Sequence, residues 1–89
     1  MLDEKTIKAL IVKAITENPA DKDAAHDAAR EEIHREMTEA WWEQVYASPI
    51  PWLDKVIDRD AISARIGDEV DDLLSKHFWP LWEEHGERS

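Results

Sequence analysis

The sequence contains no cysteine, only two glycines and no long hydrophobic run. The absence of cysteine excludes disulfide bonds, thiolate metal sites and a cysteine nucleophile. The longest apolar run, Ala9 to Val12, is far shorter than the about 20 residues that cross a bilayer. The first residues, Met1 to Lys5, also lack the basic flank and apolar stretch of a signal peptide. We therefore expect a cytoplasmic protein with no membrane partner.

The residues that usually carry catalysis are equally scarce. Neither glycine begins a phosphate-binding loop, because Gly67 is isolated in a predicted helix and Gly86 lies near the carboxyl end. The serines stand in no recognisable nucleophile motif: Ser48, Ser63, Ser75 and Ser89. We predict no catalytic residue and no cofactor, and we expect the protein not to be an enzyme.

Negative charge is what the chain has in excess. It carries 21 acidic against 11 basic residues, a net charge of −10 at pH 7. Residues 1–20 are neutral, whereas residues 21–47 and residues 48–89 each carry −5. Such a surface repels nucleic acid and anionic membranes and attracts basic proteins. The alternative interpretation is simple solubility, because acidic surfaces keep small proteins apart.

Helical periodicity runs through most of the chain. Apolar residues at helical spacing predict a first helix from about Asp3 to Glu17. Ala9 and Val12 widen its apolar stripe, so we expect this helix to be sandwiched or to form an oligomer interface. Asn18 and Pro19 suit the start of a long second helix, which reaches about Ala47.

The segment after the second helix contains two prolines, which end that helix. A short third helix is expected from about Pro51 to Arg59, with Trp52, Leu53, Val56 and Ile57 turned inward. Asp60 is the predicted cap of a last helix, which should stop or kink at Trp79–Pro80. In that helix Ser63 and Gly67 would let a neighbouring backbone come near. The fold prediction is all-α: one domain over residues 1–89, a small three- to four-helix bundle with one long central helix.

Five tryptophans are unusual in a chain of this length: Trp41, Trp42, Trp52, Trp79 and Trp82. We expect them to form one aromatic cluster where the helix ends meet. Trp41 and Trp42 point about 100° apart on a helix, so both can hardly face the same core. We assign Trp41 to the core and predict that Trp42 is partly exposed and anchors a partner.

A cluster of acids follows the prolines and is the second candidate binding feature: Asp58, Asp60, Asp68, Glu69, Asp71 and Asp72. A helix decorated in this way spaces its charges much like the phosphates of a duplex. In composition the chain is similar to small acidic helical proteins that phages make against DNA-binding defence machines, although no motif ties it to a family. The alternative is an ordinary solvated helix face.

Two carboxylate–histidine pairs have the spacing of metal ligands, Asp23 with His26 and Glu31 with His34. A di-iron bundle needs such pairs on facing helices, whereas here both lie on one helix and Arg30 stands between them. We therefore predict no metal site within one chain, although a homo-oligomer could bring two Glu31–His34 pairs together.

These patterns favour a non-enzymatic protein-interaction module. Its predicted partner is a basic protein. In the sharpest form of the hypothesis, that partner normally binds DNA or RNA, and this protein occupies its nucleic-acid site instead. The alternatives are a subunit that assembles with copies of itself and a metal-binding bundle.

Overall fold

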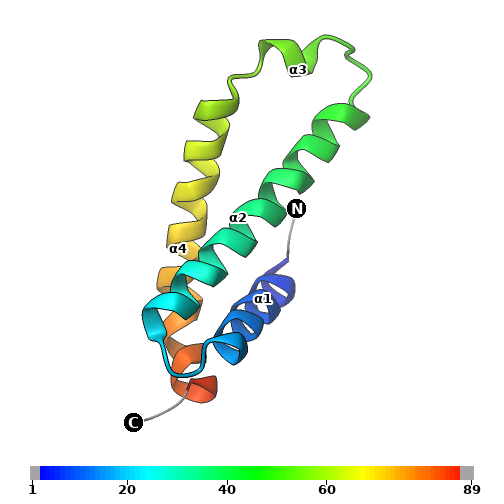
Figure 1. Ribbon diagram of the computed structural model, residues 1–89. Helices are drawn as coiled ribbons and strands as arrows, with labels where there is room; N and C mark the ends of the chain where they lie inside the picture. Colours follow the sequence, from blue (N-terminus) through cyan, green and yellow to red (C-terminus); the bar gives the residue numbers. More distant parts are fainter. Residues whose placement is uncertain (1–2, 87–89) are drawn as a thin grey trace.

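The computed structural model describes residues 3–86 and contains, in that part of the chain, four helices and no strand. They are α1 (Glu4–Glu17), α2 (Lys22–Ala47), α3 (Leu53–Val56) and α4 (Arg59–His85). Figure 1 shows α2 and α4 as a long antiparallel hairpin with α3 at its tip, and α1 packed along the other half. The all-α fold is as predicted, but α4, with 27 residues, is as long as the 26-residue α2.

None of these helices combines the length and the hydrophobicity that a bilayer crossing requires, as far as the chain is described.

The boundaries of α1 follow from its terminal side chains and were predicted correctly. Asp3 precedes the helix, and its carboxylate accepts a hydrogen bond of 2.8 Å from the backbone N–H of Thr6. Asn18 ends it: its backbone N–H and its side-chain amide both donate to the carbonyl oxygen of Ala14, at 3.1 and 3.0 Å. Because Asn18 is used in this way, it does not also cap the next helix.

The predicted start of α2 at Pro19 is therefore wrong. Asp21 caps α2 instead, accepting a hydrogen bond of 3.1 Å from the backbone N–H of Ala24. A similar correction applies to α4, which begins after Asp58 and not after Asp60. The Asp58 carboxylate accepts from the backbone N–H groups of Asp60 and Ala61, at 3.0 and 3.3 Å.

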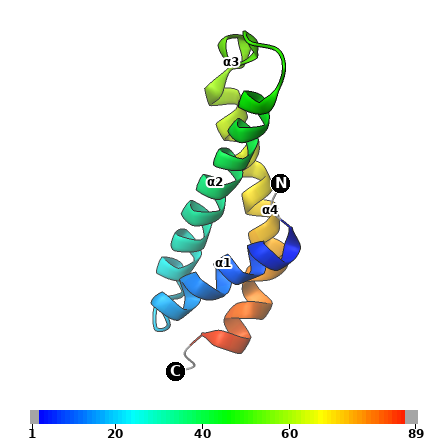
Figure 2. The same cartoon turned by 90° about the vertical axis from the view of Figure 1, so that its right-hand side faces the viewer.

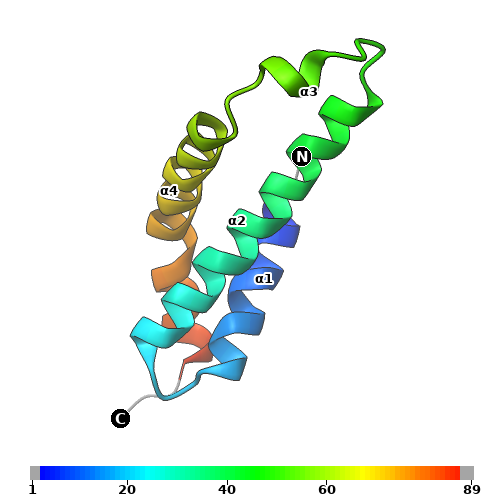
Figure 3. The same cartoon turned by 45° about the horizontal axis from the view of Figure 1, so that its top comes forward.

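The third helix is much shorter than predicted, and of its four apolar side chains predicted to turn inward only Leu53 and Ile57 are half-buried. α3 has four residues, and Trp52 and Val56 are 57% and 66% exposed. At the tip of the hairpin α3 contacts α2, but α1 lies at the other end of the molecule (Figure 3). With one facing helix, only part of the apolar side chains there is covered.

The helix does not stop at Trp79–Pro80, because α4 continues to His85 with Pro80 inside it. A proline in a helix interior costs about 3 kcal/mol. Packing beyond the proline offsets this cost, since Leu81 and Trp82 both pack against the core and the Trp82 ring stacks on Phe78.

The core lies in the half of the hairpin that α1 covers. Figure 2 shows α1 crossing both long helices there. Its buried face consists of Ile7, Ile11, Ala14 and Ile15, whereas Ala9 is exposed and Val12 is half-buried. One face of α1 is thus packed between α2 and α4, and the opposite face is open. The other buried members of the core are Ala25, Ala29, Ile33, Ile66, Val70, Leu74 and Phe78.

The aromatic residues other than the exposed Trp52 form two separate groups and not the single cluster that was predicted. His26, Phe78, Trp79 and Trp82 contact one another near the start of α2 and the end of α4. Trp41, Trp42 and Tyr46 contact one another near the end of α2. The fifteen residues between His26 and Trp41 span about 22 Å of helix. The antiparallel hairpin is the cause, because it brings the end of α4 to the start of α2.

Gly67 provides a test of helix packing. What approaches this glycine is a pair of side chains and not a backbone: an added Cβ would lie 3.9 Å from Arg30 Nη2 and 4.0 Å from His34 Cδ2. Both distances are ordinary contacts, so Gly67→Ala should raise the free energy of unfolding by about 0.5–1 kcal/mol through the lower backbone entropy of the unfolded chain. Urea denaturation followed by circular dichroism measures the change. Gly86→Ala is the opposite control, because its Cβ would meet Trp82 at 2.7 Å.

Candidate interaction surface

The two halves of the hairpin differ in what covers them. α1 has 14 residues, about half the length of α2 or α4, so most of residues 36–73 lies beyond its amino end, and only border residues such as Ile66 and Val70 share the core with it (Figure 1). We call residues 36–73 the open half of the hairpin. The open half contains ten acidic and three basic residues, so it carries −7 of the total charge of −10.

The exposed hydrophobic side chains concentrate in the same half. Among residues 3–86, five large hydrophobic side chains are exposed, and four of them lie between positions 46 and 56, the hairpin tip. The four are Tyr46, Ile50, Trp52 and Val56, and the fifth, Trp79, lies at the other end of the molecule. Several exposed apolar side chains gathered in one short segment of a small protein are a candidate interaction site.

A pocket of about 360 Å³ opens between α2 and α4 beside the amino end of α1. We call it the apolar groove. Met37, Trp41 and Leu73 are half-buried in it, because Ile7 is the first buried residue of α1 and no residue before it covers them. Polar side chains also line it: Gln44, Glu69, Asp72 and Lys76. Its remaining lining residues are Ala40 and Ile66.

Trp42, the predicted anchor, is half-buried and is engaged within the chain. The guanidinium carbon of Arg59 lies 4.5 Å from the centre of its ring, and Trp41 packs against it edge to face at 5.0 Å. A cation–π contact of this kind contributes about 0.5–2 kcal/mol. In this structure Trp42 therefore joins the end of α2 to the start of α4, and it does not line the apolar groove.

The six predicted binding acids are exposed but do not share one face of α4. Glu69 and Asp72 border the apolar groove, whereas Asp60 and Asp68 line a different hollow. Asp58 caps α4. The sixth acid, Asp71, has its carboxylate 2.8 Å from Nε of Arg30 on α2. The set is therefore divided between two sides of the helix and includes residues with structural roles.

The Arg30–Asp71 pair joins α2 to α4 and changes the titration of the carboxylate. The hydrogen bond from Arg30 lowers the pKa of Asp71 below its ordinary value. The stabilisation from this pair is therefore present at neutral pH and is lost as the pH falls through the lowered pKa of Asp71. In the Arg30→Ala variant we expect the pKa of Asp71 to rise toward its ordinary value. Carboxyl-carbon NMR titration measures it, and an unchanged pKa would contradict the pairing in solution.

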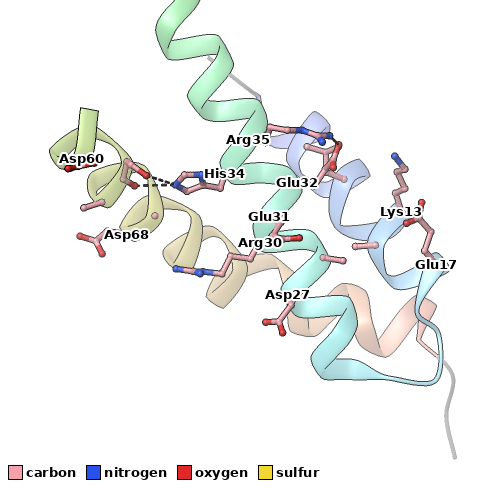
Figure 4. Close-up of a pocket in the computed structure, with 16 residues that line it drawn as sticks. Lys13, Glu17, Asp27, Arg30, Glu31, Glu32, His34, Arg35, Asp60 and Asp68 are labelled. Atoms are coloured by element: carbon pink, nitrogen blue, oxygen red, sulfur yellow. Dashed lines mark hydrogen bonds and ion pairs between the residues drawn. The ribbon is translucent and has the colours of Figure 1, made fainter. Parts of the chain in front are cut away.

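The second hollow, of about 1210 Å³, is broad and polar. Figure 4 shows its labelled side chains on both sides of α2, with Lys13 and Glu17 on one side and Asp60 and Asp68 on the other. It extends over α2 as a surface depression and gathers acids and bases together. Such a mixed surface does not select one charge of ligand.

The histidines of the two carboxylate–histidine pairs contact the neighbouring helix α4. Nε2 of His34 lies 3.2 Å from the backbone carbonyl oxygen of Ser63 on α4 and donates to it (Figure 4). The ring of His26 packs edge to face against Phe78 at 5.0 Å and stacks on Trp79. Within residues 3–86 no three His, Asp or Glu side chains gather as ligands for one metal ion.

The helical spacing of Met37, Ala40 and Trp41 places them on one inner stripe of the long helix, but that pattern did not reveal the groove that they line. The length of the helices was the signal that could have found it. A first helix of about 15 residues cannot cover a second helix nearly twice as long, so part of that inner stripe had to remain uncovered.

No protein-family model, no curated protein and no solved structure matches this chain. The functional proposal therefore depends on the residues of this chain alone.

Proposed function

We propose that the protein is a non-catalytic interaction module that binds a basic protein through the open half of its hairpin. One observation carries this proposal: the same half holds most of the net negative charge and four of the exposed hydrophobic side chains. Acidic groups guide a basic partner to the surface, and exposed aromatic and aliphatic groups hold it there once water is displaced.

Mimicry of nucleic acid is the narrower form of the proposal. In its favour, Asp60, Asp68, Glu69 and Asp72 are exposed and spaced along some three turns of one helix. Two features make this acidic surface less continuous than a strand of phosphates. Asp71 is paired with Arg30, and Arg65 stands exposed among the acids. Competition by DNA or RNA for the same partner distinguishes mimicry from ordinary acidic recognition.

The experiment is capture from a cell lysate by the immobilised protein, followed by mass spectrometry of what is retained. We expect basic proteins that are released by raised salt, because exposed charge pairs are screened within about 10 Å at ordinary ionic strength. The matched variant replaces Tyr46, Trp52 and Val56 with serine, which removes the apolar tip without changing the charge. It should retain less basic protein than the wild type does. Retention that is insensitive to both salt and these substitutions would contradict the proposal.

A further inference from the structure

We propose that the apolar groove of the open half binds one amphipathic helix of a basic partner, a proposal that rests on the interaction function above. The helix would lie against α2 and α4 beyond the amino end of α1. There it would form the third helix that this half of the hairpin lacks.

The geometry of the covered half indicates how such a helix packs. α1 places Ile7, Ile11 and Ile15 on one face, four residues apart, and all three are buried between α2 and α4. In the open half the corresponding surface is the groove, where Met37, Trp41 and Leu73 are only half-buried. The uncovered part of α2, residues 36–47, is about 18 Å long, which matches roughly three turns of a partner helix.

Charge decides which kind of helix fits. Glu69 and Asp72 border the groove on α4, and Lys76 is the basic residue that lines it. With seven net negative charges on the open half, a helix with lysine or arginine beside its apolar face is attracted, and an acidic one is repelled. A second copy of this chain would bring another ten net negative charges, so self-association through this groove is disfavoured.

The direct test uses two synthetic helical peptides of about 14 residues, roughly four turns. Both carry leucine at positions three and four apart, and the remaining positions are lysine in one peptide and glutamate in the other. Fluorescence anisotropy of the labelled peptides measures affinity for the wild-type protein. We expect the leucine–lysine peptide to bind and the leucine–glutamate peptide not to bind. Amide NMR shifts caused by the bound peptide should centre on Met37, Ala40 and Leu73.

Replacing one of two alanines with tryptophan tests whether the peptide binds in the groove. Ala40 lines the groove and Ala61 is exposed on α4 without lining it. Ala40→Trp fills the groove without changing the charge and should weaken the leucine–lysine peptide by about tenfold or more, as loss of a central contact does. Ala61→Trp adds the same bulk in the same half and should leave the affinity within about twofold. Circular dichroism verifies that both variants are folded.

The outcomes separate this proposal from the broader one. If the leucine–lysine peptide binds but its NMR shifts fall on the hairpin tip or on the far side of α2, the groove is the wrong site and the interaction function stands. Equal binding of both peptides overturns the charge argument. If wild-type protein dimerises by analytical ultracentrifugation and Ala40→Trp does not, the occupant is a second copy. If no basic peptide or protein binds anywhere, the proposed function itself fails.

Discussion

Replacing Phe78 with alanine should lower the free energy of unfolding by about 3–5 kcal/mol, the range for losing a buried aromatic side chain. Phe78 is fully buried and heads the fully buried side chains of residues 3–86 by volume. Its ring contacts His26 from α2 and stacks on Trp82, one turn further along α4. A domain of this size has about 5–10 kcal/mol of stability, so the variant should be partly unfolded at physiological temperature.

Chemical denaturation followed by helical circular dichroism measures this effect. Trp79→Ala is the matched control, because Trp79 is the neighbouring residue, also aromatic, and 46% exposed. It stacks on His26 and lies under Nζ of Lys22 at 5.3 Å, contacts whose loss costs about 1 kcal/mol. Equal losses in the two variants would contradict the arrangement of this end of the bundle.

The second large effect concerns binding. Replacing Asp68, Glu69 and Asp72 with lysine changes the net charge from −10 to −4 and should weaken binding of the leucine–lysine peptide by about tenfold to hundredfold at low salt. The association rate should fall most, because these exposed charges act on the approach of the partner. Asp71 is left unchanged, since its reversal would repel Arg30 and disturb the contact between α2 and α4. Stopped-flow fluorescence measures the association and dissociation rates of the peptide.

The control for charge alone is a second triple variant. Glu17, Asp27 and Glu31 are exposed, lie outside the open half and line the polar hollow. Their replacement with lysine also changes the net charge to −4, yet it should weaken binding of the leucine–lysine peptide much less than the first triple variant does. Raising the salt concentration should reduce the differences in peptide affinity among the wild type and the two triple variants. If both triple variants lose the same affinity, the net charge and not a located surface attracts the peptide.

The terminal capping residues show where local sequence was sufficient and where it was ambiguous. Asp3 and Asn18 mark the two ends of α1 as predicted, because each has its hydrogen-bond partners within four residues. Asp58 and Asp60 are both good caps by residue type. Only the path of the chain around the tip places Asp58 with its carboxylate against the free N–H groups at the start of α4.

The candidate site shows the same division. The acids and the tryptophans are visible in the sequence, but their grouping depends on which helix ends meet. Trp42 is placed under Arg59, and His26 against Phe78, by the antiparallel hairpin. The apolar groove exists because α1 begins beside the middle of α2 and leaves the rest of α2 and α4 uncovered. This is a relation between three helices that no local pattern contains.

The sequence by itself determined the helical class, the long helix after Asn18, the apolar stripe of the first helix and the negative charge, since helical periodicity and charge are local properties. The tertiary structure alone decided that α4 runs through Pro80, that the aromatic residues form two groups and that α1 leaves half of the hairpin open. These features follow from packing between segments far apart in the chain. There the burial of side chains such as Leu81 and Trp82 outweighs the local preference of a single proline.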